Sequence, residues 1–151
     1  SDVAPGAPGA RRGLPSTRLG LSGLEERLSI LGGTFHAFRS DGLWVVEAIL
    51  PFAPHLIGNV VLPALHGGVI GAFMEMTALA QLSVTQPSAK VHKTIDITIE
   101  YLRPGKAMTT YARADVRKIG RQIANVHVEA WQDSPDRLFA QGTGHFLMPE
   151  A

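Results

Sequence analysis

The segment from Val69 to Val84, VIGAFMEMTALAQLSV, is apolar on nearly every face and contains a single ionisable side chain, Glu75. Its content of Ala, Leu and Met favours a helix. A helix that is hydrophobic all round must be covered on all sides by other parts of the fold. The rest of the chain must therefore wrap this helix. It must also account for a carboxylate among apolar side chains, which is costly unless it is paired or functional.

Four segments after this helix have the two-residue period of β-strands. In TIDITIEYL, the isoleucines at 95, 97 and 99 and Tyr101 lie on one face, and polar residues lie on the other. In RQIANVHVEAWQD, small and apolar residues likewise alternate with polar ones. We therefore expect one apolar sheet face to pack on the helix. The four segments are residues 94–102, 108–120, 121–133 and 137–148.

The part before the central helix has three recognisable elements. Leu21–Gly32 spaces its leucines as in an amphipathic helix and ends at a pair of glycines. Thr34–Phe38 and Leu43–Leu50 are predicted strands, joined by the turn RSDG. Residues 51–68, with three prolines and three glycines, predict a long irregular loop. We interpret residues 1–20 as a flexible tail and residues 21–151 as the folded domain.

Composition excludes several classes of protein. The 151-residue chain carries 14 Lys and Arg against 13 Asp and Glu, without a basic stripe, which argues against nucleic acid as a partner. The absence of cysteine excludes thiol catalysis and fits a cytoplasmic protein. The histidines lack a ligand-like spacing with acids, so no metal site is expected. Glu75, Thr77 and Gln81 interrupt the longest apolar run, so we expect no membrane span.

The order of the elements predicts an α+β hotdog fold, in which an antiparallel sheet curls around one long hydrophobic helix. The sequence also carries an Asn in the loop, HGG at the helix start, an acid nine residues after the His, and YLRPG at a strand end. In these features, over about residues 34 to 148, it resembles the PaaI-type acyl-CoA thioesterases of the 4-hydroxybenzoyl-CoA thioesterase superfamily. One departure is Glu75, because that branch commonly has Asp there.

The helix start has the chemistry of an oxyanion hole. The first backbone N–H groups of a helix have no intrahelical acceptor, and Gly67 and Gly68 let a substrate carbonyl approach them closely. Glu75 lies eight residues beyond Gly67, which is about 12 Å along the helix axis. One chain therefore cannot use both groups on one carbonyl. A second copy with an antiparallel helix could supply the missing group.

The family resemblance implies a role for each of these residues. Gly67 polarises a thioester carbonyl, and Glu75 is either the nucleophile or the general base. His66 holds the loop, and Asn59 orients substrate or water. The resemblance also implies a homodimer with sheets joined edge to edge, and often a homotetramer. The structural alternatives are an acid paired at the helix edge, a tight glycine entry, a helix cap at His66 and a turn at Asn59.

The resemblance also places substrate contacts on the chain. Phosphate contacts of coenzyme A are expected from Arg103, Arg117, Lys118 and Arg121. Each of these cations could equally be solvated at a hairpin tip. An acyl pocket suited to an aryl or medium acyl group is expected along the long loop and the helix, with Phe52, Leu62, Phe73 and Met74. Gly68 and Thr77 are further candidate substrate contacts, and Thr77 could equally serve packing or dimer contacts.

We therefore predict an acyl-CoA thioesterase that releases a free acid and CoA. No dissociable cofactor is implied, because coenzyme A is part of the substrate. Two alternatives remain open at this point. A hotdog hydratase acting on enoyl or hydroxyacyl thioesters would need an acid and a His paired across the site. A non-catalytic acyl-CoA-binding protein could use the same fold. The sequence leaves the acyl group and the carrier, CoA or acyl carrier protein, undetermined.

Overall fold

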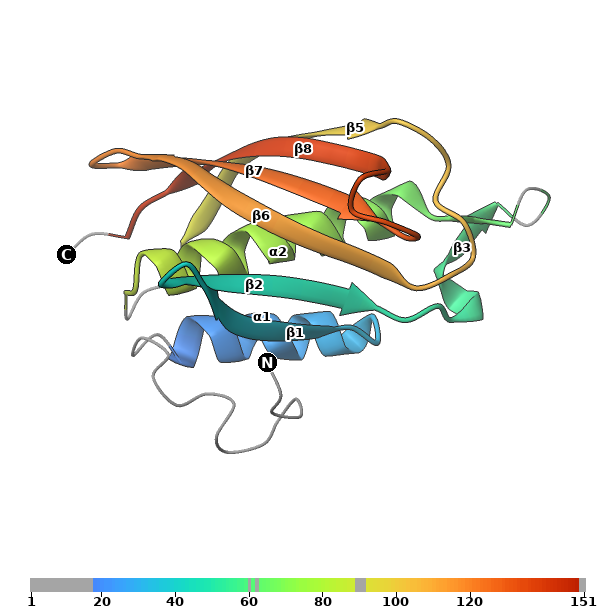
Figure 1. The fold of residues 1–151 in the computed structure, drawn as a ribbon, viewed down its shortest axis with the longest axis horizontal. Helices are drawn as coiled ribbons and strands as arrows, with labels where there is room; N and C mark the ends of the chain where they lie inside the picture. Colours follow the sequence, from blue (N-terminus) through green and yellow to red (C-terminus); the bar gives the residue numbers. More distant parts are fainter. Residues whose placement is uncertain (1–17, 60, 62, 89–91, 150–151) are drawn as a thin grey trace.

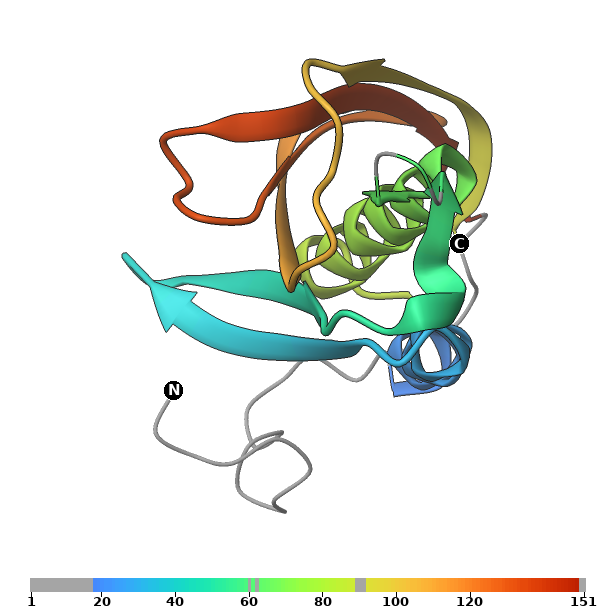
Figure 2. The ribbon, with the colours of Figure 1, turned by 90° about the vertical axis from the view of Figure 1, so that its right-hand side faces the viewer.

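The structure is a computed structural model that describes residues 18–59, 61, 63–88 and 92–149. A six-stranded antiparallel sheet curls around the helix α2 (Gly67–Thr85), as Figures 1 and 2 show. A shorter helix, α1 (Arg18–Ile30), lies along the sheet margin below α2. The strands in sheet order are β1 (Thr34–Ser40), β2 (Leu43–Leu50), β6 (Thr110–Ile119), β7 (Ile123–Trp131), β8 (Leu138–Leu147) and β5 (Lys93–Tyr101). This arrangement confirms the predicted hotdog fold.

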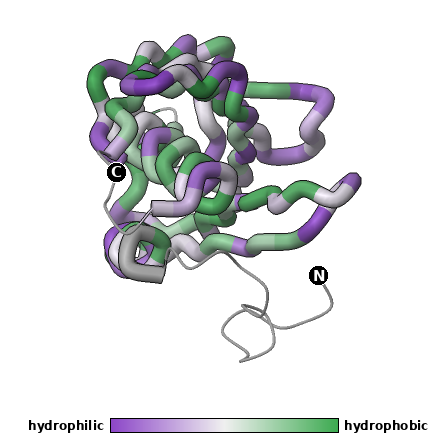
Figure 3. Tube along the Cα trace, turned by 90° about the vertical axis from the view of Figure 1, so that its left-hand side faces the viewer, coloured by the Kyte–Doolittle hydropathy of each residue, from purple (hydrophilic) through white to green (hydrophobic). Residues whose placement is uncertain are grey.

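The core lies between α2 and the inner face of the sheet. The alternation in β7 is realised as expected, because Ala124, Val126 and Val128 are fully buried against the helix while the residues between them face outward. Leu24 and Leu28 of α1 complete the cover from another side. Hydrophilic residues gather at the turns that join the strands (Figure 3). The apolar helix is thus enclosed by side chains that recur at strand and helix periods.

The cover over α2 is complete only along its C-terminal half. Every residue from Met76 to Val84 is buried, whereas Gly67, Gly68 and Ala72 are exposed and Glu75 is half-buried. The prediction that the helix is wrapped on all sides is therefore wrong for one face of its N-terminal half, whereas Ile70, Phe73 and Met74 on the other face are buried. Its open face carries small residues and the carboxylate.

Length and composition alone would allow α2 to span a membrane, contrary to the expectation that no segment is long enough. The helix has 19 residues, and 67% of its most apolar window is buried inside the fold. Its apolar character is accounted for by its place in the core.

Two segments before α2 differ from the sequence interpretation. The first helix begins at Arg18, three residues before its expected start at Leu21, and residues 1–17 lie outside the described residues. The expected irregular loop contains a 3-10 turn (Pro54–Leu56) and a small sheet of β3 (Ile57–Asn59) and β4 (Ala64–Leu65). Strands this short leave no readable alternation in sequence, so the prolines and glycines dominated the prediction.

Two glycines in this part are required by backbone geometry. Asp41 and Gly42 both have positive φ, 51° and 79°, and form the two-residue hairpin loop between β1 and β2. Gly58 lies so close to the backbone of His66 that a Cβ would stand 2.8 Å from the His66 Cα. Any side chain at position 58 would push β3 away from the start of α2.

β2 and β6 separate along part of their length. Where they separate, the side chain of Gln81 on α2 forms hydrogen bonds with the backbone of β2. The two strands pair only over Glu47–Leu50 and Thr110–Arg113, and then diverge (Figure 1). Beyond that point the Gln81 Oε1 accepts a hydrogen bond from the Val46 N–H at 2.8 Å, and its Nε2 donates to the Trp44 carbonyl at 2.9 Å. The buried amide therefore replaces a missing strand neighbour.

We expect Gln81→Leu to lower the free energy of unfolding by about 2 to 4 kcal/mol, because it leaves a buried N–H and a carbonyl without partners. Urea unfolding measures the change. The matched control is Gln122→Leu at the exposed turn after β6, which should stay within about 0.5 kcal/mol of the wild type. Equal stabilities of the two variants would contradict the role given to Gln81.

Candidate active site

His66 builds the start of α2. Its backbone N–H donates to the Leu56 carbonyl at 2.8 Å, and its carbonyl accepts from the N–H groups of Val69 and Ile70. Its side chain caps the helix, because Nδ1 accepts a hydrogen bond from the Gly68 N–H at 2.9 Å. With Nδ1 accepting, the proton of the neutral ring resides on Nε2. The capping role, one of the two interpretations of His66, is therefore present in the structure.

The cap leaves one helix-start amide for a ligand. The Gly68 N–H is occupied by His66, so it is not free to bind substrate in this arrangement. Among the hydrogen bonds of the described residues, none takes up the N–H of Gly67. The Gly67 carbonyl accepts a hydrogen bond from the Tyr101 hydroxyl at 2.7 Å. An exposed amide with a positive helix-dipole end behind it is suited to bind a carbonyl oxygen.

A hollow lies beside this amide. It has a volume of about 400 Å³ and is lined by Ala64 and Leu65, by Gly67 and Ile70 of α2, and by residues 101–105. Its lining is largely apolar, with Arg103 as the one cation on it. The hollow therefore joins an apolar surface to a hydrogen-bond donor, the combination found in sites for small molecules with a polar head.

Glu75 is held by a residue that the sequence interpretation missed. The Thr94 hydroxyl donates to the Glu75 Oε2 at 2.7 Å, across the space between β5 and α2. The carboxylate is half-buried and has no basic partner among the ion pairs of the described residues. This contact agrees with the alternative of an acid that pairs with a neighbour at the helix edge. The neighbour that orients the carboxylate is a neutral donor.

A β-bulge explains why Thr94 reaches Glu75. Thr94 pairs with Phe146 and Asp96 pairs with His145, so Ile95 is an extra residue in β5. In a regular strand without this bulge, Thr94 and Asp96 would lie on the same, outward face. The prediction that Ile95 belongs to the buried face is wrong, because its side chain is 50% exposed. A bulge commonly re-aims one side chain, and strict alternation in the sequence hides it.

Three residues expected to contact substrate lie inside the core. Phe73, Met74 and Thr77 are fully buried. The Thr77 hydroxyl donates to the Phe73 carbonyl at 2.7 Å, so its polar group is satisfied within the helix. Their burial agrees with the alternative that these side chains serve packing. That they contact substrate stays a prediction. Asn59 ends β3, where its backbone pairs with Ala64, and its side chain lies outside what the structure describes.

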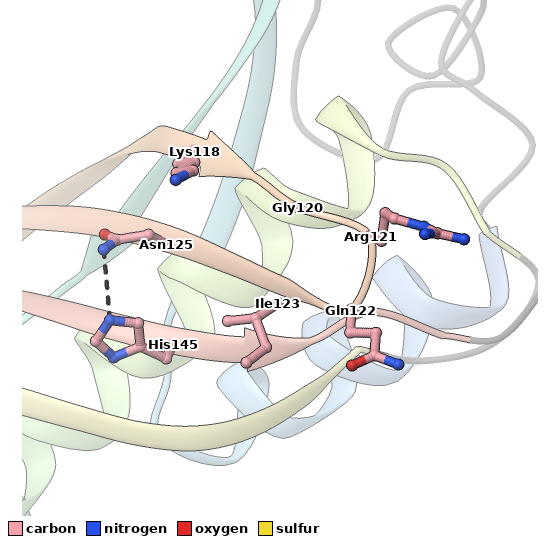
Figure 4. A pocket seen from close by; sticks show the side chains of 7 residues that line it. All are labelled: Lys118, Gly120, Arg121, Gln122, Ile123, Asn125 and His145. Atoms are coloured by element: carbon pink, nitrogen blue, oxygen red, sulfur yellow. Dashed lines mark hydrogen bonds between the residues drawn. The ribbon is translucent and has the colours of Figure 1, made fainter.

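The four expected phosphate contacts do not form one cluster in a single chain. Arg117 forms an ion pair with Asp115 at 2.7 Å. Lys118 and Arg121 line a hollow of about 890 Å³ on the outer face of the sheet, and Arg121 points away from Lys118 (Figure 4). Arg103 lies at the other end of β8, where its N–H donates to the Phe139 carbonyl.

Two of the histidines pair with acids. On the outer sheet face, His145 Nδ1 lies 2.7 Å from Asp96 and His127 Nε2 lies 3.1 Å from Glu129. Asn125 also contacts His145, at 3.4 Å (Figure 4). The His145–Asp96 pair joins the neighbouring strands β8 and β5, which sequence spacing does not reveal. His127 and Glu129 lie two residues apart on one face of β7. In the part of the chain that the structure describes, no three His, Asp or Glu side chains gather as a metal site.

Comparisons with known proteins agree with this geometry. A model of the thioesterase superfamily matches residues 62–139, slightly more than half of the chain. The medium/long-chain acyl-CoA thioesterase YigI of Salmonella typhimurium is 26% identical over 110 residues, which are 63% of this chain and 69% of YigI. A crystal structure from Chromobacterium violaceum is 30% identical, with a TM-score of 0.63, and the match covers 86% of this chain and 96% of that protein.

The hotdog likeness extends to PaaI of Escherichia coli, which is 20% identical, with a TM-score of 0.72 over 87% of this chain and 95% of PaaI. That likeness shows the fold alone. The family match and the fold together define the class of this protein as a hotdog-fold thioester hydrolase. The chain belongs to the thioesterase superfamily, as its resemblance to the PaaI-type enzymes predicted.

One further ionisable group lies near the site. His92, two residues before Thr94, is buried, and both of its ring nitrogens lack a hydrogen-bond partner in the described structure. Burial therefore lowers the pKa of His92 below its ordinary value. The folded state takes up this proton less readily than the unfolded state, in which the pKa is about 6.5. His92 thus favours folding above that pH and loses this contribution as the pH falls.

We expect the wild type to lose free energy of unfolding more steeply than His92→Leu when the pH falls from about 7 toward 5. The reason is that protonation of the buried imidazole is penalised only in the folded wild type. Denaturant unfolding at a series of pH values measures both curves. His36→Leu, at a half-buried position on β1, is the control. Parallel curves for wild type and His92→Leu would contradict the assignment.

Proposed function

We propose that this thioester hydrolase acts on an acyl-CoA with an aryl or medium-chain acyl group and releases the free acid and CoA. The observation that carries the proposal is the Glu75 carboxylate, held by Thr94 on the open half of an otherwise buried helix. A carboxylate retained at such a position suits general base or nucleophilic chemistry. The activity in the name of YigI supports CoA as the carrier.

We further propose that one active site uses two chains. Gly67 and Glu75 lie eight residues apart on one straight helix, about 12 Å along its axis. A thioester carbonyl bound at the Gly67 N–H is therefore out of reach of the carboxylate in the same chain. An antiparallel partner helix would bring its own Glu75 to this amide, and by symmetry two equivalent sites would form.

The edge strand β5 supplies the support for this arrangement. Among the described strands it is bonded only to β8, so its other edge offers unpaired backbone groups. Thr94 near one end of β5 contacts Glu75, and Tyr101 at the other end contacts Gly67. If two copies pair β5 antiparallel about its middle, Thr94 of one copy lies opposite Tyr101 of the other. The same pairing then brings Glu75 toward the partner subunit's Gly67.

The open face of α2 and the free edge of β5 have surfaces suited to contact a second copy of the chain. Gly68, Ala72 and Glu75 follow one another at helical spacing on the open face of α2, and the two small residues would let a second helix approach closely. Ile95 at the bulge and Leu102 just after β5 expose large apolar side chains beside the free edge. A dimer formed there would cover apolar surface that a single chain leaves in water.

In the proposed reaction the Gly67 N–H donates to the thioester carbonyl oxygen, where negative charge grows in the transition state. The partner's Glu75 takes a proton from an attacking water, or attacks the carbonyl carbon itself. In the first route, the water oxygen bonds to the carbonyl carbon, the carbon–sulfur bond breaks, and the CoA thiolate takes up the proton that Glu75 had accepted. In the second route, the carbon–sulfur bond breaks to leave a mixed anhydride on Glu75 and a CoA thiolate that is protonated from water. A water molecule then hydrolyses the anhydride, which releases the free acid and restores the carboxylate. Thr94 keeps the carboxylate in one orientation in both routes. No dissociable cofactor is needed for either.

The same twofold arrangement suggests how cations could reach the CoA phosphates. Within one chain, Arg103 and the pair of Lys118 and Arg121 lie at opposite ends of β8. Antiparallel pairing of two β5 strands would carry the Arg103 end of one chain toward the Lys118 end of the other. Phosphate groups are bound well by such cations because each contact is charge-assisted.

Glu75→Gln is expected to reduce the rate of free-thiol release from acyl-CoA by about two orders of magnitude or more, because the amide is neither a base nor a nucleophile. The assay compares aryl, short, medium and long acyl-CoAs. Glu100→Gln makes the same chemical change on the outer face of β5 and should keep the wild-type rate.

Three outcomes of this assay would count against the proposal. Wild-type activity in Glu75→Gln would exclude the carboxylate from catalysis. Binding of acyl-CoA by the wild type without thiol release from any substrate would indicate a non-catalytic binding protein. Addition of water to an enoyl-CoA with the thioester left intact would indicate a hydratase.

Mixing two inactive variants tests the shared site. A Cβ at Gly67 would meet the Tyr101 hydroxyl at 3.6 Å, an ordinary van der Waals contact, so position 67 admits a Cβ. We expect the side chain of Gly67→Val to shield the amide. Co-expressed Glu75→Gln and Gly67→Val chains should regain about a quarter of the wild-type rate. Half of randomly formed dimers are mixed, and each mixed dimer has one intact site of two. No recovery above the separate variants would mean that each site belongs to one chain.

A further inference from the structure

The peptide group between Gly67 and Gly68 is held at both of its ends. At one end, the Tyr101 hydroxyl donates to the Gly67 carbonyl at 2.7 Å. At the other end, the Gly68 N–H donates to the His66 Nδ1 at 2.9 Å. The carbonyl and the N–H belong to the same planar unit, so two side chains from different elements fix one peptide plane.

These two hydrogen bonds form a clamp on the Gly67–Gly68 peptide. The clamp acts at a point where the backbone torsion angles are least restricted. Two successive glycines have no Cβ to limit their torsion angles, and the first turn of a helix lacks the hydrogen bonds of its interior. On the preceding side, the His66 N–H is anchored to the Leu56 carbonyl at 2.8 Å. The Gly67 N–H itself belongs to the His66–Gly67 peptide, whose carbonyl accepts hydrogen bonds from the Val69 and Ile70 N–H groups. The torsion angles of Gly67 join this peptide to the Gly67–Gly68 peptide. Loss of the Tyr101 hydrogen bond would free the second plane, and the start of the helix that carries the Gly67 N–H could then turn.

The helix surface is shaped to admit the Tyr101 hydroxyl. A Cβ built on Gly67 would stand 3.6 Å from this oxygen, and one built on Gly71 would stand 3.5 Å from it. The phenol thus rests on a stretch of helix without side chains. The Tyr101 side chain is 51% exposed, so burial of its ring does not by itself explain the residue. Phenylalanine would pack equally well there, and only the hydroxyl makes the hydrogen bond.

We propose that Tyr101 is a positioning residue that holds the Gly67–Gly68 peptide and thereby aims the Gly67 N–H at the thioester carbonyl. This inference rests on the proposed function, in which that amide stabilises the developing oxyanion. A misdirected donor weakens binding of the transition state more than binding of the ground state. The turnover number should therefore change, and the KM should not.

The test is Tyr101→Phe, which removes only the hydroxyl. We expect kcat to fall about tenfold and the KM for acyl-CoA to stay within about twofold, because a donor is misaligned and not deleted. The matched control is Tyr111→Phe, at a ring that stacks on Trp131 with centroids 6.0 Å apart. This control should keep the wild-type kcat. Glu75→Gln is measured beside both variants.

The outcomes separate this inference from the proposed function. A wild-type kcat in Tyr101→Phe, with activity lost in Glu75→Gln, would overturn the positioning role and leave the proposed function intact. A raised KM with unchanged kcat would also overturn it, since that result would make Tyr101 a simple substrate contact. Full activity in Glu75→Gln would count against the proposed function itself.

Hydrogen exchange gives a readout that does not depend on turnover. In protein labelled with 15N-glycine, the amide of Gly68 should exchange at least about threefold faster in Tyr101→Phe than in the wild type, because the clamp is open on one side. Tyr111→Phe should leave that rate unchanged. Equal exchange rates in all three proteins would overturn the proposal, even if Tyr101→Phe were less active because of lower stability.

Discussion

The structure depends on the need to cover α2, a 19-residue helix that is apolar on almost every face. Sheet residues of small or branched type meet it from above, as at Ala124 and Val126, and Leu28 of α1 meets it from the side. Burial of this surface is the dominant favourable contribution to folding. Where the cover stops, on one face of the N-terminal half of the helix, the fold leaves open the surface on which the candidate site is built.

β5 links the two halves of the candidate site. It lies at the margin of the sheet and contacts α2 through Thr94 and Tyr101. Each contact involves a side chain turned toward the helix, one because of the bulge at Ile95 and the other at the end of the strand. One strand therefore orients both the acid and the peptide at the helix start, and its unpaired edge is the surface through which two such chains would combine.

Much of the fold could be predicted because the patterns that indicate its strands and turns involve residues close together in the sequence. Alternation in residues 121–133 and the hairpin signal around Gly42 indicated strands and a turn that the structure contains. The residues missed depend on contacts distant in sequence. Thr94 faces Glu75 only because a bulge shifts the register, and Gln81 is buried only because β2 and β6 separate above it. Neither the bulge in β5 nor the separation of β2 and β6 can be recognised from the hydrophobic period of the sequence.

The sequence by itself determined the apolar central helix, the strands that wrap it, the glycines at its start and an acid eight residues beyond Gly67. Hydrophobic period and turn chemistry suffice for these features, because each is set by neighbours along the chain. The tertiary structure alone decided that His66 caps the helix, that Tyr101 holds the Gly67 carbonyl and that the predicted cations lie apart. These depend on the register of strands and on the exposure of each face, which arise only when distant segments pack together.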